Sequence, residues 1–436
     1  MANVIDSYIA DAERAGESRR GADPAWLVEA RRHALDRFRA LGFPTSRDEE
    51  WRFTSVAPIA ERPFALARNG ASTLRHQDLD LLRLPIEPAA TLVFVNGRSV
   101  PALSAIGPLP PGVSVASMTA GALADVVEKH LTRAVTADRH AFTALNTAFL
   151  LDGAVVFVPP GMVVDAPIHL VFTSSAEERP TSAHPRVLVV VGARSRATIV
   201  ESYGGRAASA YFSNGVTELF AGENATVDHY KLQQESAEAA HIGALYIHAR
   251  RDATVTCHSI ALGGSLVRND VTAVLDGEGG ECTLNGLYFG DRRTLVDNHT
   301  TIDHARPHCA SREIYKGILA DHARAVFNGK IIVRPDAQKT DAKQTNKALL
   351  LSEDAQINTK PQLEIFANDV KCTHGAAIGQ MDDEAIFYLR ARGLAEPEAR
   401  RMLIRAFAGD VLSRIPLAAL GSRLVEQLMR RLPGGS

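Results

Sequence analysis

Cys372 and His374 are the residues of this chain whose types and spacing are best suited to metal chemistry. If segment 368–375 is extended, side chains two positions apart project to the same side, so a thiol and an imidazole would be presented together. The alternative is structural: the cysteine is buried and the histidine hydrogen-bonded where the domain ends. A lone Cys-X-His is a much weaker metal signal than paired Cys-X-X-Cys motifs.

The overall composition is that of an ordinary globular protein. Of 436 residues, 46% are hydrophobic and 22% are charged, with a formal net charge of -2. There is no basic excess to attract nucleic acids or anionic lipids. The first residues lack the basic and apolar segments of a secretory signal, and the longest apolar runs, such as 187–191, fall far short of the ~20 residues that cross a bilayer. We therefore expect a cytoplasmic protein with no nucleic acid and no membrane as partners.

The remaining thiols give little support for a disulfide or zinc framework. Cys257, Cys282, Cys309 and Cys372 are widely separated along the chain. Disulfide-rich domains and tetrahedral zinc sites need paired or closely spaced cysteines. The sequence therefore assigns no role to Cys257, Cys282 or Cys309.

The middle of the chain repeats at a fixed interval. The triplets centred on Thr198, Thr226 and Thr254 lie 28 residues apart, each follows a turn-like segment, and a second strand-like stretch recurs half a period later. Two strands and two turns per repeat are typical of one coil of a parallel β-helix. A β-sandwich is the rival, but antiparallel hairpins are not expected to keep a constant period.

The repeat also predicts a column of polar residues. Steps of 28 residues from Glu201 lead to His229, Cys257 and Asn285. Stacked coils would place these four about 4.8 Å apart on the more apolar face of the strands. We expect them to form a polar seam inside the coil, and the alternative is a hydrogen-bonded ladder of purely structural value.

Helical patterns flank the repeat. Asp23 and Pro24 predict the cap and first turn of an amphipathic helix, and Trp51 is expected to pack its loop onto the body of the protein. Beyond the repeat, Asp382 is a predicted helix cap and Pro397 opens a second helix. The apolar stripe of that helix is expected to comprise Met402, Leu403, Ala406, Phe407, Val411 and Leu412.

Together these patterns predict a mainly β protein, with a right-handed parallel β-helix core flanked by N-terminal and C-terminal α-helical regions. The expected boundaries follow the changes in composition. They give an N-terminal helical region at 1–90, a mixed transition segment at 91–153, the β-helix core at 154–375 and a C-terminal helical domain at 376–436.

Longer stretches of the chain resemble the SufB/SufD family, the β-helical scaffold subunits of the SUF iron–sulfur cluster assembly system. The resemblance covers essentially the whole length and is to the smaller, SufD-type subunit. It is carried by residues 48–54, 145–149, 339–346, 361–365, 369–375 and 383–393.

The resemblance implies a scaffold rather than an enzyme, with no catalytic residues. SufD-type subunits pair with a SufB subunit along their β-helices and attach a SufC ATPase through C-terminal helices, where residues 400–408 match the docking segment. The chain has no glycine-rich phosphate loop with its lysine, so ATP hydrolysis would have to come from such a partner. The isolated chain is also a candidate homodimer.

The same resemblance implies a role for the Cys-X-His segment. His374 matches the histidine at the subunit interface that helps to hold the nascent cluster, and Cys372 matches a position of the same motif with a less firmly assigned role. Iron–sulfur clusters take thiolates most readily and accept imidazole as a substitute. We therefore expect a transient iron–sulfur cluster shared with the partner. A flavin has been associated with the family's complex, but no dinucleotide fingerprint is visible in this sequence.

Two further function classes are weighed against a scaffold. Secreted-type β-helical carbohydrate-active lyases use the same coil, but they need a secretory signal and clustered carboxylates, Lys and Arg on an exposed sheet face. Neither is evident in the sequence. A purely structural homodimer that binds no metal is the third class.

Overall fold

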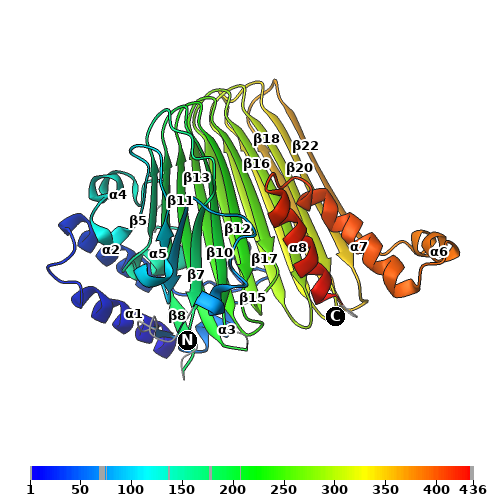
Figure 1. The fold of residues 1–436 in the computed structure, drawn as a ribbon, viewed down its shortest axis with the longest axis horizontal. Coiled ribbons are helices and arrows are strands. Elements are labelled where there is room, and N and C mark those ends of the chain that lie inside the picture. Colours follow the sequence, from blue (N-terminus) through cyan, green and yellow to red (C-terminus); the bar gives the residue numbers. More distant parts are fainter. Residues whose placement is uncertain are drawn as a thin grey trace.

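In the described residues, two long sheets of 11 strands each enclose the interior of a β-solenoid, with helices at both ends (Figure 1). This computed structural model describes residues 2–67, 74, 76–135, 138–175, 179–206 and 208–432. Neighbouring strands of the solenoid run parallel, and the chain alternates between the two sheets for about seven coils. The predicted mainly β fold with a parallel β-helix and terminal helices is confirmed.

Sheet A contains one strand from each coil. Its main path is β21-β19-β17-β15-β13-β11-β9-β6-β5, and the short strands β1 and β8 pair at its side. Its strands are β1 (Ala65–Leu66), β5 (Ser114–Ser117), β6 (Ala154–Val158), β8 (Thr181–Ala183), β9 (Arg186–Val191), β11 (Tyr211–Ala221), β13 (Ala240–Ala249), β15 (Leu266–Leu275), β17 (Leu295–His304), β19 (Arg324–Val333) and β21 (Gln356–Ile365).

Sheet B contains the other strand of each coil. Its order is β22-β20-β18-β16-β14-β12-β10-β7-β2-β3, and β4 pairs with β2. Its strands are β2 (Ala90–Val95), β3 (Arg98–Ser99), β4 (Ala105–Ile106), β7 (Ile168–Ser174), β10 (Arg196–Gly205), β12 (Thr226–Gln234), β14 (Thr254–Ala261), β16 (Glu281–Gly290), β18 (Ala310–Leu319), β20 (Asp341–Leu350) and β22 (Lys371–Gln380).

Inward-facing side chains of both sheets fill the solenoid, because alternate residues of a strand point to opposite faces. Val187 and Val189 of β9 and Ile199 of β10 are completely buried in this core. Aromatic rings stack from strand to strand. The ring centroids are 5.1 Å apart for Phe94 and Phe172, and 5.0 Å apart for Phe172 and Tyr203.

The predicted turns before each repeat are present at one corner of the solenoid. Arg194, Asn224 and Asp252 lie there in successive coils, with left-handed φ angles of 56°, 57° and 52°. This conformation reverses the chain direction tightly, at a local cost for residues that carry a Cβ. The turns vary in length. The number of residues between two strands that pair is therefore less regular than the sequence repeat.

The predicted column is wrong in two of its three steps. His229 and Cys257 are neighbours in register, but Glu201 pairs with Lys231 and Cys257 pairs with Leu284. Residue 285 lies on the opposite face of β16, because Leu284 belongs to the inner core. The register depends on turn length, which the sequence period does not reveal.

The N-terminal helices cover sheet A at the first coils. These are α1 (Ala2–Glu17), α2 (Ala25–Leu41) and α5 (Ala141–Ala148). The short helices and helical turns of the N-terminal part are η1 (Glu49–Trp51), α3 (Ala57–Ala60), η3 (His76–Leu79), η4 (Pro101–Leu103), η5 (Met118–Ala120) and α4 (Ala124–His130). The predicted cap is wrong: Pro24 occupies the cap position of α2. The Asp23 carboxylate instead forms ion pairs with Arg19 and Arg31 at 2.7 and 2.6 Å.

The C-terminal helices α6 (Asp383–Ala391), α7 (Glu396–Leu412) and α8 (Ala418–Arg431) follow the last strand. α7 and α8 lie against the solenoid, whereas α6 projects away from it (Figure 1). Asp382 caps α6 as predicted, accepting hydrogen bonds from the backbone N–H groups of residues 384 and 385. The apolar stripe of α7 differs from the prediction, because Ile404 and Ala408 are buried together with Val411 and Leu412. Met402 is 49% exposed. The buried face packs on the outer side of sheet B.

Among the described residues, no helix combines the length and the apolar character needed to cross a membrane.

Candidate functional site

Cys372 and His374 lie on β22, the last strand of sheet B. Their register partners on β20 are Ala342 and Gln344, which are both buried on the inner face of the solenoid. Cys372 and His374 therefore share the inner face, as their spacing predicts. Because β22 ends the described part of the sheet, no further coil covers this face, and His374 is exposed.

The thiol of Cys372 is half-buried rather than open. It packs against a small apolar cluster that includes Ile331, Val333 and Ala342. Burial raises the pKa of Cys372 above its ordinary value. The thiol therefore remains protonated at neutral pH, and a metal would have to displace its proton.

Glu201 and His229 meet inside the solenoid although they are not register partners. His229 Nε2 lies 2.8 Å from Glu201 Oε1, and each residue is only 1% exposed. The Tyr203 hydroxyl donates to the same carboxylate at 2.7 Å. A buried carboxylate needs such partners to offset its lost hydration. The predicted polar seam is thus present for these residues, but Asn285 is not part of it.

The other thiols lie in the core. Cys257, Cys282 and Cys309 are buried, and all four cysteines are free. Burial raises the pKa of Cys282 to about 12 and that of Cys257 well above its ordinary value. In the part of the chain that the structure describes, no three His, Cys, Asp or Glu side chains form a metal-binding group.

The loop at residues 47–54 is fastened to the outer face of sheet A. The Arg268 guanidinium lies 3.7 Å from the centre of the Trp51 ring, and the Thr54 hydroxyl donates to Asp297 at 2.6 Å. Arg268 also donates to Asp297 at 2.8 Å. The expected packing role of Trp51 is confirmed by these contacts.

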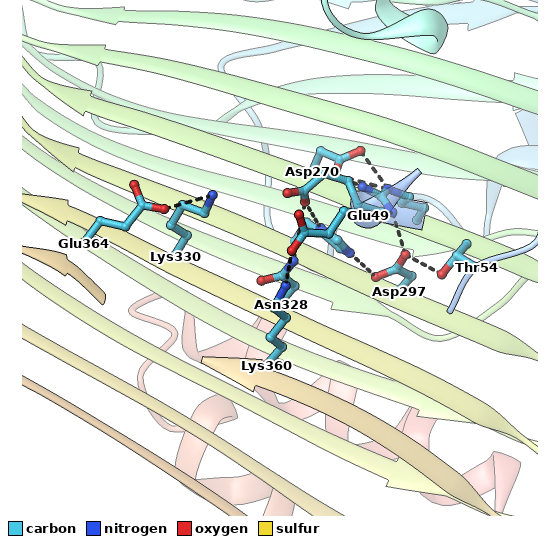
Figure 2. A network of polar contacts seen from close by, with 11 residues as sticks. Glu49, Thr54, Asp270, Asp297, Asn328, Lys330, Lys360 and Glu364 are labelled. Carbon is cyan, nitrogen blue, oxygen red and sulfur yellow. Dashed lines mark hydrogen bonds and ion pairs between the residues drawn. The ribbon is translucent and has the colours of Figure 1, made fainter. Parts of the chain in front are cut away.

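A row of charged residues extends this attachment along the sheet (Figure 2). Glu49 accepts from Lys360 of β21 at 2.6 Å, and Glu50 accepts from Asn328 of β19 at 3.4 Å. His299 lies 3.1 Å from Glu50 and 3.0 Å from Asp297. Sequence reasoning missed this row, because its members come from separate strands and share no motif.

The pKa of His299 reflects these neighbours. Burial alone would lower it, but the charge of Asp297 and the hydrogen bonds to Asp297 and Glu50 outweigh burial and raise the pKa to about 9. His299 is therefore a cation at neutral pH. Its charge-assisted hydrogen bond to Glu50 joins the N-terminal loop to β17, and its ion pair with Asp297 lies within β17 itself.

A shallow apolar hollow lies between α6 and α7. Its lining includes Phe387, Tyr388, Met402 and Leu403. Phe387 is 74% and Tyr388 56% exposed. Exposed aromatic side chains gathered in this way are typical of a surface that binds another protein.

Comparisons with known proteins agree with one another. Residues 172–407 match the family model "SUF system FeS cluster assembly, SufBD core domain", and residues 5–170 match "SufBD protein N-terminal region". The chain is 37% identical to an iron–sulfur cluster assembly SufBD family protein of Synechocystis, over 93% of this chain and 91% of that protein. It is 32% identical to the iron–sulfur cluster assembly protein SufD of Escherichia coli, over 94% and 93%. It is 28% identical to SufD of Bacillus subtilis, over 95% and 96%.

Proposed function

The chain belongs to the SufBD family of SUF iron–sulfur cluster assembly proteins, and we propose that it is a SufD-type scaffold subunit that catalyses no reaction itself. The observation that carries the proposal is the location of His374, exposed on the inner face of the last coil. There its imidazole is available to a nascent cluster, the cargo of the assembly. We place this activity in the cytoplasm.

His374 is the better ligand of the two candidate donors in this chain. A neutral imidazole coordinates iron through a lone pair without losing a proton, whereas the Cys372 thiol is half-buried and has a raised pKa. One imidazole and at most one thiolate leave at least half of the ligand positions of a cluster to be filled from outside this chain. Weak ligation of this kind suits a scaffold that must release its cargo.

A SufB-like subunit is the proposed partner at the open end. The strands β21 and β22 are 10 residues long and each has a strand neighbour on one side only within the described residues. Such edges recruit a further strand through backbone hydrogen bonds. Phe366 and Ile378, which are 62% and 47% exposed, supply apolar contact area. Without the partner, a second copy of this chain would use the same edges in a homodimer.

A SufC-like ATPase is the proposed partner of the C-terminal helices. The residues after 380 form this docking unit, and its contact surface is the apolar hollow between α6 and α7. Phe387 and Met402 are the exposed apolar anchors. ATP hydrolysis by this partner would supply the energy for assembly.

The test of the cluster site is reconstitution of the complex with SufB-like and SufC-like subunits under anaerobic conditions. We expect His374→Ala to lower bound iron and acid-labile sulfide several-fold, because a ligand is lost while the solenoid is unchanged. Thr373→Ala is the matched control, since Thr373 is an exposed neighbour on the opposite face of β22. Iron and sulfide contents would be measured chemically and the cluster by absorption spectroscopy.

Equal iron and sulfide contents in the wild type and His374→Ala would refute the cluster site. Assembly with the partner and circular dichroism would verify that the variant is folded. Cys372→Ser is expected to lower loading less than His374→Ala, because burial raises the pKa of the Cys372 thiol and iron must displace its proton before the sulfur can bind.

A further inference from the structure

Behind His374, a row of polar residues leads into the solenoid. Glu313 of β18 pairs in register with Gln344 of β20, and Gln344 pairs with His374 of β22. Paired residues in neighbouring strands lie about 4.8 Å apart and face the same side. The three side chains therefore follow one another on the inner face, from the core to the open end.

Gln344 is held in one orientation from the interior side. Its Nε2 donates to Glu313 Oε2 at 2.7 Å, and the exposures of Gln344 and Glu313 are only 2% and 4%. Burial raises the pKa of Glu313 to about 7, so the group is mainly an ionised carboxylate above neutral pH. In that form it accepts but does not donate, and the contact then requires the NH2 group and not the amide oxygen to face Glu313.

The amide oxygen of Gln344 is left without a hydrogen-bond partner among the described residues. An unsatisfied buried acceptor is costly and uncommon in folded proteins. Gly329 on the facing strand β19 leaves room for the Gln344 side chain, because a Cβ at Gly329 would collide with the Gln344 amide. This arrangement maintains a fixed acceptor one strand away from the His374 ring.

We propose that Gln344 is a positioning residue for His374, with Glu313 as its support. When the exposed ring turns inward, one ring N–H donates to Gln344 Oε1, and the other nitrogen keeps its lone pair for the cluster. Ligating histidines in metal sites are oriented by this kind of outer hydrogen bond. The inference rests on the proposed role of His374.

The first test observes the ring directly, without a cluster. Histidine-selective 15N labelling of the full chain gives the two ring-nitrogen shifts of His374, assigned by their loss in His374→Ala. We expect one tautomer to dominate in the wild type. In Gln344→Leu the tautomer ratio should change about tenfold, the effect of one lost hydrogen bond.

A swap variant separates positioning from damage to the fold. Glu313→Gln combined with Gln344→Glu keeps one carboxylate and one amide in contact and still offers His374 an acceptor. We expect it to restore the single tautomer that Gln344→Leu loses. In the reconstituted complex, Gln344→Leu should weaken iron binding about 10- to 100-fold, and the swap should recover it.

The outcomes distinguish the two proposals. An unchanged tautomer ratio in Gln344→Leu would overturn the positioning role, even if His374→Ala loses its cluster and so supports the proposed function. Full loading of His374→Ala would overturn the cluster site, whatever the tautomer ratio. A changed ratio together with weakened loading supports both.

Discussion

His299 joins two carboxylates from distant parts of the chain, Asp297 of β17 and Glu50 of the N-terminal loop. Two further charged groups of β15 face this contact: Arg268, which pairs with Asp297, and Asp270, the register partner of His299. An unfolded histidine has its pKa near 6.5, and in the fold it is raised to about 9. The protonated ring therefore stabilises the fold fully below about pH 6.5, and this contribution is lost as the pH rises through 9.

His299→Gln is expected to lower the free energy of unfolding by up to about 3 kcal/mol near pH 6, from a pKa difference of about 2.5. The difference from the wild type should shrink above pH 9. Urea unfolding at pH 6, 8 and 10 measures it. His322→Gln is the control, because its pair with Asp354 is on the surface and should contribute little at any pH. A constant difference for His299→Gln across this range would contradict the assignment.

At the scale of the element, tyrosine rings of neighbouring strands fill space left by glycines. Tyr288 of β16 pairs with Gly317 of β18, and Gly286 of β16 pairs with Tyr315 of β18. A Cβ at Gly317 would overlap the Tyr288 ring, and one at Gly286 would overlap the Tyr315 ring. These two strands can stack at their normal spacing only because each ring lies over a residue without a side chain.

We expect Gly317→Ala to destabilise the protein by about 1 to 3 kcal/mol, the usual range for overpacking a core. Gly379→Ala on β22 is the matched control, because a Cβ there meets nothing within 4 Å. Chemical denaturation of both variants checks the prediction. If Gly317→Ala matched Gly379→Ala in stability, the interlocking of rings and glycines would not limit the packing of these coils.

At the scale of the whole molecule, the C-terminal helices both cover the solenoid and present a surface to a partner. Leu420, Leu424 and Leu428 of α8 are buried together with Leu287 and Phe289 of β16. A chain truncated at 380 would expose this apolar face of sheet B and tend to aggregate. Truncation therefore cannot test docking cleanly, and surface substitutions are needed.

Phe387→Glu combined with Met402→Glu should abolish co-purification of the SufC-like ATPase, because charges replace both exposed anchors of the hollow. The fold should be unaffected, since neither side chain is buried. Val28→Glu on α2 is the control, because Val28 is 49% exposed and belongs to the opposite end of the chain. Normal capture of the ATPase by the double variant would refute docking at this hollow.

The repeat period of the sequence was sufficient to predict the fold, but it did not predict which residues of neighbouring strands pair. Alternating apolar residues and recurrent turns specify stacked coils, because each coil must bury its inner face against the next. Turn length sets how far one coil is shifted against another, and this is why Asn285 faces away from the seam. The stripe of α7 was misassigned for a related reason: its buried face follows the shape of sheet B, which no local pattern encodes.

What the sequence determined by itself was the solenoid, its terminal helices, the family and the shared face of Cys372 and His374, all of which follow from local spacing or extended similarity. Only the tertiary structure decided that this face lies at an open end, that Gln344 and Glu313 stand behind it, and that His299 joins the N-terminal loop to the sheet. These contacts connect residues from different coils or from distant segments. Their geometry depends on how the coils stack, and a one-dimensional pattern does not contain that information.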